Sequence, residues 1–250
     1  MAVGLGTPVE LDDPASLLHS GDQAMWTGDY DAAISHYSAA IRLQTAAGDN
    51  RQASLTCVRL GGVFAYMLGN RVAARPWFNR AMRLVENESP CVEQGYAALA
   101  MLGCDVDDPS VLVERAELAL DRARQFGDLD LEVKALADGG LAHVQAGRVT
   151  RGMAMLDEAM ALATGGSTND ATVIGRSVCS FFTACLFAAD FARAEAWSGV
   201  LRDRGIMGPA PGPQAFNTSQ CASIQGTMLC ATGRWSEAEE LLVGAYDEME

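Results

Sequence analysis

Small and hydrophobic residues recur along the chain with a helical period, and one short pattern returns five times. It consists of a small residue, a large apolar residue two positions later, a second small residue at position five, and apolar or small residues at positions nine and twelve. The pattern begins at Gly28, Gly69, Gly147, Ala189 and Gly233, and in the second occurrence the large apolar residue, Val72, comes one position later. Positions five, nine and twelve share one face of an α-helix, so each occurrence predicts an amphipathic helix that follows a turn.

Each occurrence also predicts how that helix meets the one before it. A glycine at the first position permits the left-handed backbone conformation that ends a helix. The large residue at position two, such as Trp235, is expected to fill the corner between the helices, and the small residue at position five, such as Ala33, lets them approach closely. Gly61–Gly62 and Gly139–Gly140 are expected at the tightest crossings. The pattern therefore indicates pairs of helices.

The spacing of the pattern predicts how many pairs there are. The occurrences start 41, 78, 42 and 44 residues apart. The long interval holds one degenerate unit, in which Asp108 is a cap, Pro109 opens a helix, and helical periodicity runs from Val111 to Phe126. We therefore expect an all-α fold, a solenoid of about six antiparallel helix pairs stacked in a right-handed superhelix, because no pair can bury its apolar face alone.

Proline and charge suggest how the chain is organised. We expect an N-terminal tail over residues 1–13, five repeats over 14–205, a Pro/Gly linker over 206–213, and a sixth pair over 214–250. The linker is not expected to be helical, because it contains Pro209, Pro211 and Pro213. Pro76 should kink a predicted helix or delay its start. Residues 247–250 are acidic and would lie unfavourably at the negative end of a helix dipole. Two interpretations stay open: the chain is a fragment of a longer one, or its last helical face docks on a partner.

Several of these stretches resemble a known family. The segment Gly28–Ala40 is similar to the tetratricopeptide consensus. The stretches 91–96, 147–160 and 175–197 resemble the tetratricopeptide region of actinobacterial LuxR-type transcriptional regulators. In that family the repeats form a sensing or interaction module, and a separate C-terminal helix-turn-helix binds DNA. Only one helix fits after Gly233, so the resemblance implies a regulatory module without the DNA-binding part.

Composition and charge limit which partners the protein is expected to bind and in which compartment it is expected to function. The formal net charge of −14 repels phosphate backbones, so we expect no direct contact with nucleic acid. The N-terminus has no basic segment followed by an apolar one, and we expect neither a secretory signal nor a membrane span. The seven cysteines form no CxxC pair and are expected to be reduced core thiols of a cytoplasmic protein.

Residue patterns for catalysis are scarce. His19, His36 and His143 have no HExxH or Cys/His spacing around them, so no metal ligand is expected. The segment Gly165–Ser167 lacks the lysine of a phosphate-binding loop. A thiol site between Cys179 or Cys185 and the pair Cys221 and Cys230 is an alternative to simple core packing. We therefore expect no catalytic residue and no cofactor.

The predicted binding surface is the concave groove that the first helix of each pair lines in tetratricopeptide arrays. Counting back from the repeat anchors places eight residues there: Arg59, Val63, Tyr66, Lys134, Leu141, Arg176, Thr183 and Phe187. Three of them, Arg59, Lys134 and Arg176, would hold the carboxylates of a partner segment, while Tyr66 and Phe187 supply apolar contact. The alternative is that they are ordinary salt-bridged surface residues.

Three function classes follow from this surface. The first is a regulatory domain that senses a protein, a peptide or another ligand, and the second is a stand-alone adaptor that scaffolds a complex. The third is an enzyme or small-molecule binder that uses the groove, which only the cysteines and histidines support. Exposed end faces of solenoids also allow the chain to pair as a homodimer.

Overall fold

The computed structural model describes residues 13–102, 108–168, 170–206 and 213–247. The predicted tail and most of the predicted linker lie outside these residues. The chain divides into two compact units, residues 1–85 and 86–250, and each unit is described by itself. All regular structure in the described ranges is helical, which confirms the prediction of an all-α fold.

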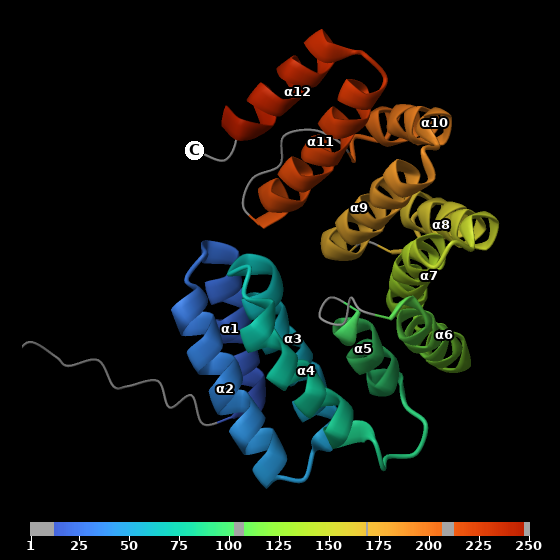
Figure 1. Ribbon diagram of the computed structural model, residues 1–250. Helices are drawn as coiled ribbons and strands as arrows, with labels where there is room; N and C mark the ends of the chain where they lie inside the picture. Colours follow the sequence, from blue (N-terminus) through green and yellow to red (C-terminus); the bar gives the residue numbers. More distant parts are fainter. Residues whose placement is uncertain (1–12, 103–107, 169, 207–212, 248–250) are drawn as a thin grey trace, which may run out of the picture. The chain divides into compact units, whose positions relative to one another are not determined.

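The first unit is formed by helices that pack on their neighbours in the sequence (Figure 1). Its elements are α1 (Pro14–Thr27), α2 (Tyr30–Ala46), α3 (Asn50–Gly62), a π-helical turn η1 (Val63–Met67) and α4 (Arg71–Val85). Aspartates begin the helices: the carboxylates of Asp13, Asp29 and Asp49 accept hydrogen bonds from backbone amides of the first turns. These caps satisfy amides that have no partner inside the helix.

The second unit contains two kinds of helix contact. Its helices are α5 (Val92–Met101), α6 (Pro109–Phe126), α7 (Leu129–Gln145), α8 (Val149–Thr164), α9 (Ala171–Ala188), α10 (Phe191–Asp203), α11 (Pro213–Ala231) and α12 (Trp235–Asp247). Consecutive helices pack on each other, as α7 does on α8 and α11 on α12. In addition α7 packs on α5 and α9, and α9 packs on α11 (Figure 1). Alternate helices from α5 to α11 therefore lie next to one another.

The five repeat anchors all adopt the left-handed backbone that the sequence predicts. The φ angles are 77° at Gly28, 62° at Gly69, 77° at Gly147, 78° at Gly233 and 52° at Ala189. Within the described residues, Ala189 is the one non-glycine with positive φ. Its Cβ approaches the following carbonyl, which costs roughly 1 kcal/mol that a glycine avoids.

Helix crossings are built from a glycine on one helix and a large side chain on the next. A Cβ added to Gly21 would lie 2.6 Å from Cε1 of Tyr37, and one added to Gly140 would lie 2.6 Å from Cγ of Leu156. A Cβ on Gly61 would come closer still to the ring of Phe78. Tyr37, Phe78 and Leu156 all stand at position nine of the repeated pattern and are fully buried. Gly226 faces Leu242, also at position nine, in the same way.

The pair α9 and α10 uses the opposite arrangement. Ser198 occupies position nine of this repeat, and Phe182 stands sixteen residues before it, where Gly21 and Gly140 stand in their repeats. Phe182 is fully buried and Ser198 nearly so. At these two positions the first helix therefore carries the large residue and the second the small one, the reverse of the order in the other repeats.

Three local expectations from the sequence hold only in part. Phe191 packs on the core of its unit, but in three other repeats the large residue near the start of the pattern does not fill a corner, because Val72, Val149 and Trp235 are 86%, 41% and 65% exposed. These residues stand at or next to the first position of a helix, where no preceding turn covers the side chain. Pro76 does not delay α4, which begins at Arg71, so of the two alternatives the kink stays a prediction. Gly62 is not at a crossing, since a Cβ there would meet only Tyr66, at 3.8 Å.

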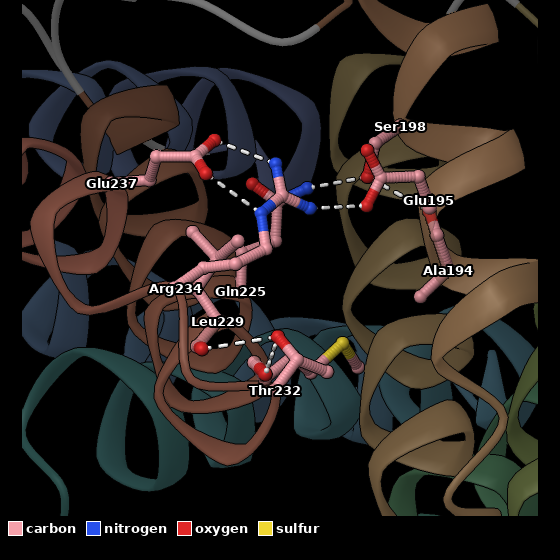
Figure 2. A network of polar contacts seen from close by, with 9 residues as sticks. Ala194, Glu195, Ser198, Gln225, Leu229, Thr232, Arg234 and Glu237 are labelled. Atoms are coloured by element: carbon pink, nitrogen blue, oxygen red, sulfur yellow. Dashed lines mark hydrogen bonds and ion pairs between the residues drawn. The ribbon is translucent and has the colours of Figure 1, made fainter.

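Ion pairs connect alternate helices of the second unit at a separation near that of the repeat. Arg151 on α8 contacts Glu117 on α6 at 3.0 Å, and Arg193 on α10 pairs with Asp157 on α8. Figure 2 shows the next step, where Arg234 before α12 contacts Glu195 on α10 at 2.6 Å. Exposed pairs of this kind contribute little to stability, so they fix the register more than they stabilise the fold.

Helix α9 is long and apolar enough to cross a membrane by length and composition, and it is the one such helix in the described ranges. It carries much of the largest core of the second unit, which includes Phe181, Phe182 and Cys185 from α9 together with Leu156 and Leu201. Its apolar composition is therefore used in packing within this structure.

The strained turn at Ala189 gives a direct test of the repeat anchors. Ala189→Gly is expected to raise the free energy of unfolding by about 0.5–1 kcal/mol, because glycine adopts positive φ without a clash. The matched control Gly147→Ala, at a turn with φ 77°, is expected to lower it by about 1 kcal/mol. Urea unfolding followed by circular dichroism measures both, and a loss of stability in Ala189→Gly would contradict the account.

Candidate functional site: the α7/α9 strip

One face of α7 and one face of α9 carry most of the residues that the sequence assigns to a binding surface. On α7 these are Lys134, Asp138 and Leu141, and on α9 they are Arg176, Ser180, Thr183 and Phe187. Their separations of three and four residues place each set on one side of its helix. We call these seven residues the α7/α9 strip. These two helices pack directly on each other, and of the predicted residues Lys134 and Arg176 are brought together near Asp138.

Asp138 is the centre of the strip, and the sequence analysis missed it. Its side chain is only 8% exposed. It accepts a hydrogen bond from Nε of Arg176 at 2.9 Å and another from Oγ of Ser180 at 3.0 Å. Nη2 of Arg176 also lies 2.9 Å from the carboxylate. A buried carboxylate needs such partners, so these contacts join α7 to α9 at a fixed register.

Lys134 lies one turn before Asp138 and is held by an aromatic ring. Its Nζ is 5.4 Å from the ring centre of Tyr96 on α5, a cation–π contact. The hydroxyl of Tyr96 donates to the carboxylate of Asp128, the N-cap of α7, at 3.2 Å. Burial lowers the pKa of Lys134, and nearby carboxylates, Asp170 foremost, partly offset that effect. Desolvation removes the shell of water that stabilises the ammonium ion.

These contacts change the role expected for the two cations. From the sequence, Lys134 and Arg176 are expected to bind the carboxylates of a partner segment. In the structure Arg176 is paired with Asp138, and Lys134 interacts electrostatically with Asp170, Asp130 and Asp138. The two cations therefore serve first to hold α5, α7 and α9 together. What the strip presents outward is mainly the ring of Phe187, which is 63% exposed.

The three residues of the first unit that were expected on the binding surface differ in their burial. Arg59 is half-exposed and its Nη1 lies 3.0 and 2.8 Å from the two carboxylate oxygens of Asp22 on α1. Tyr66 is partly buried. Val63 is 1% exposed and belongs to the core, so its assignment to a binding surface is corrected. The cause is the π-helical turn η1, which breaks the 3.6-residue period on which the counting relied.

His143 on α7 is a buried polar group outside the strip. It is 2% exposed, and neither ring nitrogen has a hydrogen-bond partner within the described part of the chain. Nε2 lies 3.9 Å from a carboxylate oxygen of Glu117 on α6, too far for a hydrogen bond. Burial, followed by the charges of Arg148 and Arg151, lowers the pKa of His143, while Glu117 opposes this shift. The imidazole is therefore held in its neutral form.

The cysteines and acidic residues give little support to catalysis. Burial raises the pKa of Cys57 to about 11 and that of Cys185 to about 12, so both thiols stay protonated near neutral pH. A protonated thiol is a weak nucleophile and a poor metal ligand. The side chain of Cys221, one half of the alternative thiol site, lies outside the described residues. Among the described residues no three His, Cys, Asp or Glu side chains are grouped as a metal site requires.

Comparison with protein-family models gives no match, and comparison with curated proteins gives none either.

The buried imidazole of His143 gives a pH test. Because its pKa is lower in the folded state than in the unfolded state, its neutral form stabilises the fold fully above about pH 6.5. This stability is lost as the pH falls from that value towards the lowered pKa, with a slope of at most about 1.4 kcal/mol per pH unit.

We expect the pH dependence of the unfolding free energy between pH 7.5 and 5 to be smaller in His143→Leu than in the wild type. His19→Leu, at an exposed position on α1, is the matched control. Urea titrations at several pH values measure the difference. An equal dependence in wild type and His143→Leu would show that the neutral buried form is not what this histidine contributes.

Proposed function

We propose that the protein is a protein-interaction or sensing module of the tetratricopeptide type, with a regulatory role in the cytoplasm. In this proposal its helix pairs are antiparallel hairpins that follow one another as a solenoid. The similarity of residues 147–160 and 175–197 to LuxR-type regulators supports the regulatory part. The repeated pairing of a small residue with a large one across helix crossings supports the hairpin part.

The observation that carries the proposal is the α7/α9 strip. Alternate helices α5, α7 and α9 pack side by side, and buried polar contacts at Asp138 and Tyr96 fix their faces relative to one another. A rigid surface of this kind loses little conformational entropy when it binds a partner. The exposed ring of Phe187 then offers the large aromatic contact that is typical of binding hot spots.

The charge pattern of the strip favours a peptide or protein partner over a small ion. Arg176 is already paired with Asp138, and Lys134 lies near the carboxylates of Asp170, Asp130 and Asp138, so a single anionic ligand would compete with these internal contacts. An extended or helical segment can instead place an apolar residue on Phe187 and exchange hydrogen bonds along the polar part of the strip. The proposed ligand is therefore a polypeptide segment with an apolar anchor.

The test compares two exposed phenylalanines. Phe187 is 63% exposed in the strip, and Phe126 is 47% exposed at the end of α6, outside it. Immobilised wild type, Phe187→Ser and Phe126→Ser are used to capture partners from the native cell extract, followed by mass spectrometry and titration of the identified partner. Both substitutions are expected to change the unfolding free energy by less than about 0.5 kcal/mol.

We expect Phe187→Ser to weaken binding of that partner at least about tenfold, since hot-spot truncations cost more than about 1–2 kcal/mol. Phe126→Ser should bind as the wild type does. A partner that binds Phe187→Ser and the wild type equally would remove the strip from the proposal.

A further inference from the structure

The net charge of the chain is distributed very unevenly. Residues 1–85 contain seven basic and seven acidic side chains, so their net charge is zero, while residues 86–250 carry eleven basic and 25 acidic ones and therefore the whole net charge of −14. Within the first unit the separation continues. Residues 51–85, which form α3, η1 and α4, contain six arginines and no aspartate or glutamate.

Helix α4 carries four of these arginines on and beside its exposed side. The buried side consists of Ala74, Phe78, Ala81 and Val85. The opposite side, which we call the α4 face, is made by Val72, Arg75, Pro76, Asn79, Arg80 and Arg83. Arg75, Pro76 and Arg83 are exposed, and Val72 is 86% exposed. The face therefore combines positive charge with apolar surface.

Arg80 and Arg83 of α4 differ in their surroundings from several arginines of the second unit. Arg124, Arg151, Arg193 and Arg234 each contact a carboxylate on their own or a neighbouring helix. Helix α4 contains no carboxylate, so no pair along the helix can neutralise its charge. Across the described residues no carboxylate lies within ion-pair distance of Arg80 or Arg83. Instead the guanidinium carbon of Arg80 lies 6.0 Å from the ring centre of Trp77, stacked on an aromatic face.

We propose that the α4 face is a docking surface for an acidic, amphipathic segment of a partner protein. Guanidinium groups bind carboxylates through two parallel hydrogen bonds, and stacking on Trp77 holds Arg80 ready for this contact. Val72 and Pro76, between the arginines, receive apolar side chains of the same segment. Glutamates at positions i, i+4 and apolar residues between them match this spacing on a helix.

A nucleic acid fits the same surface less well. Phosphate backbones would meet the arginines, but Val72 and Pro76 offer nothing to a sugar–phosphate chain. This inference rests on the proposed role in protein interaction, but it concerns a surface separate from the α7/α9 strip.

Fluorescence anisotropy with the full chain tests the proposal. The probe is a fluorescein-labelled helical peptide with glutamates and leucines at the spacing given above, compared with the same peptide in which glutamine replaces every glutamate. The variants are Arg83→Glu, Arg83→Gln and Arg42→Glu. Arg42 is exposed on α2 and is the one arginine among residues 1–50, so Arg42→Glu makes the same charge change in the same unit outside the α4 face.

We expect the glutamate peptide to bind at least tenfold more tightly than the glutamine peptide at 50 mM salt, and more weakly at 300 mM. Arg83→Glu should weaken it at least tenfold, Arg83→Gln several-fold, and Arg42→Glu less than twofold. Thermal unfolding shows whether each variant is folded. Equal binding of both peptides, or equal losses in Arg83→Glu and Arg42→Glu, would overturn the proposal. So would tighter binding of a 20-base-pair DNA duplex than of the glutamate peptide.

This outcome is distinguishable from failure of the proposed function. The difference in peptide binding between Arg83→Glu and Arg42→Glu reports on the α4 face, whereas the capture experiment reports on Phe187 on α9.

Discussion

The close contact of a small residue with a large side chain across a helix crossing is the constraint on which this structure depends. At Gly21, Gly61, Gly140 and Gly226 even a methyl group would overlap the facing side chain. Interiors are packed as densely as crystals, so such a contact cannot be relaxed without moving a helix. It sets the distance between the two helices and thereby the positions of all residues that they carry.

The binding strip is a consequence of this packing. Once α7 is held against α8 through Gly140 and Leu156, its other side is free to pack on α9. Asp138, two residues before Gly140, then meets Arg176 and Ser180. The polar contacts do not create the arrangement of the helices, because a buried ion pair recovers little beyond its desolvation cost. They select one register among those that the apolar packing allows.

Much of this could be predicted from the sequence where the helices are regular. The left-handed anchors, the cap at Asp108 and the shared face of Lys134, Arg176, Thr183 and Phe187 follow from a 3.6-residue period and from glycine conformation. Val63 was misplaced because a π-helical turn has no clear sequence signature. Asp138 was missed because its partners lie on α9, 38 and 42 residues away, and only the packing of α7 on α9 brings them together.

Charged residues are distributed unevenly between the two units, and the net charge of the whole chain does not reveal this. In the second unit several arginines contact carboxylates on other helices, as Arg234 contacts Glu195 in Figure 2. In α4 they stand on a helix without carboxylates, next to exposed apolar side chains. An average of −14 over the chain is therefore a poor guide to what its individual surfaces bind.

A double-mutant cycle at Gly61 and Phe78 tests the central constraint most directly. Gly61→Ala should lower the unfolding free energy by about 1–3 kcal/mol through overpacking, while Gly62→Ala, one residue away with open space around it, should leave it unchanged or raise it slightly. Phe78→Leu makes room, so the double variant should be more stable than the sum of the single losses by at least about 1 kcal/mol. Additive losses, or an effect of Gly61→Ala no larger than that of Gly62→Ala, would contradict the account.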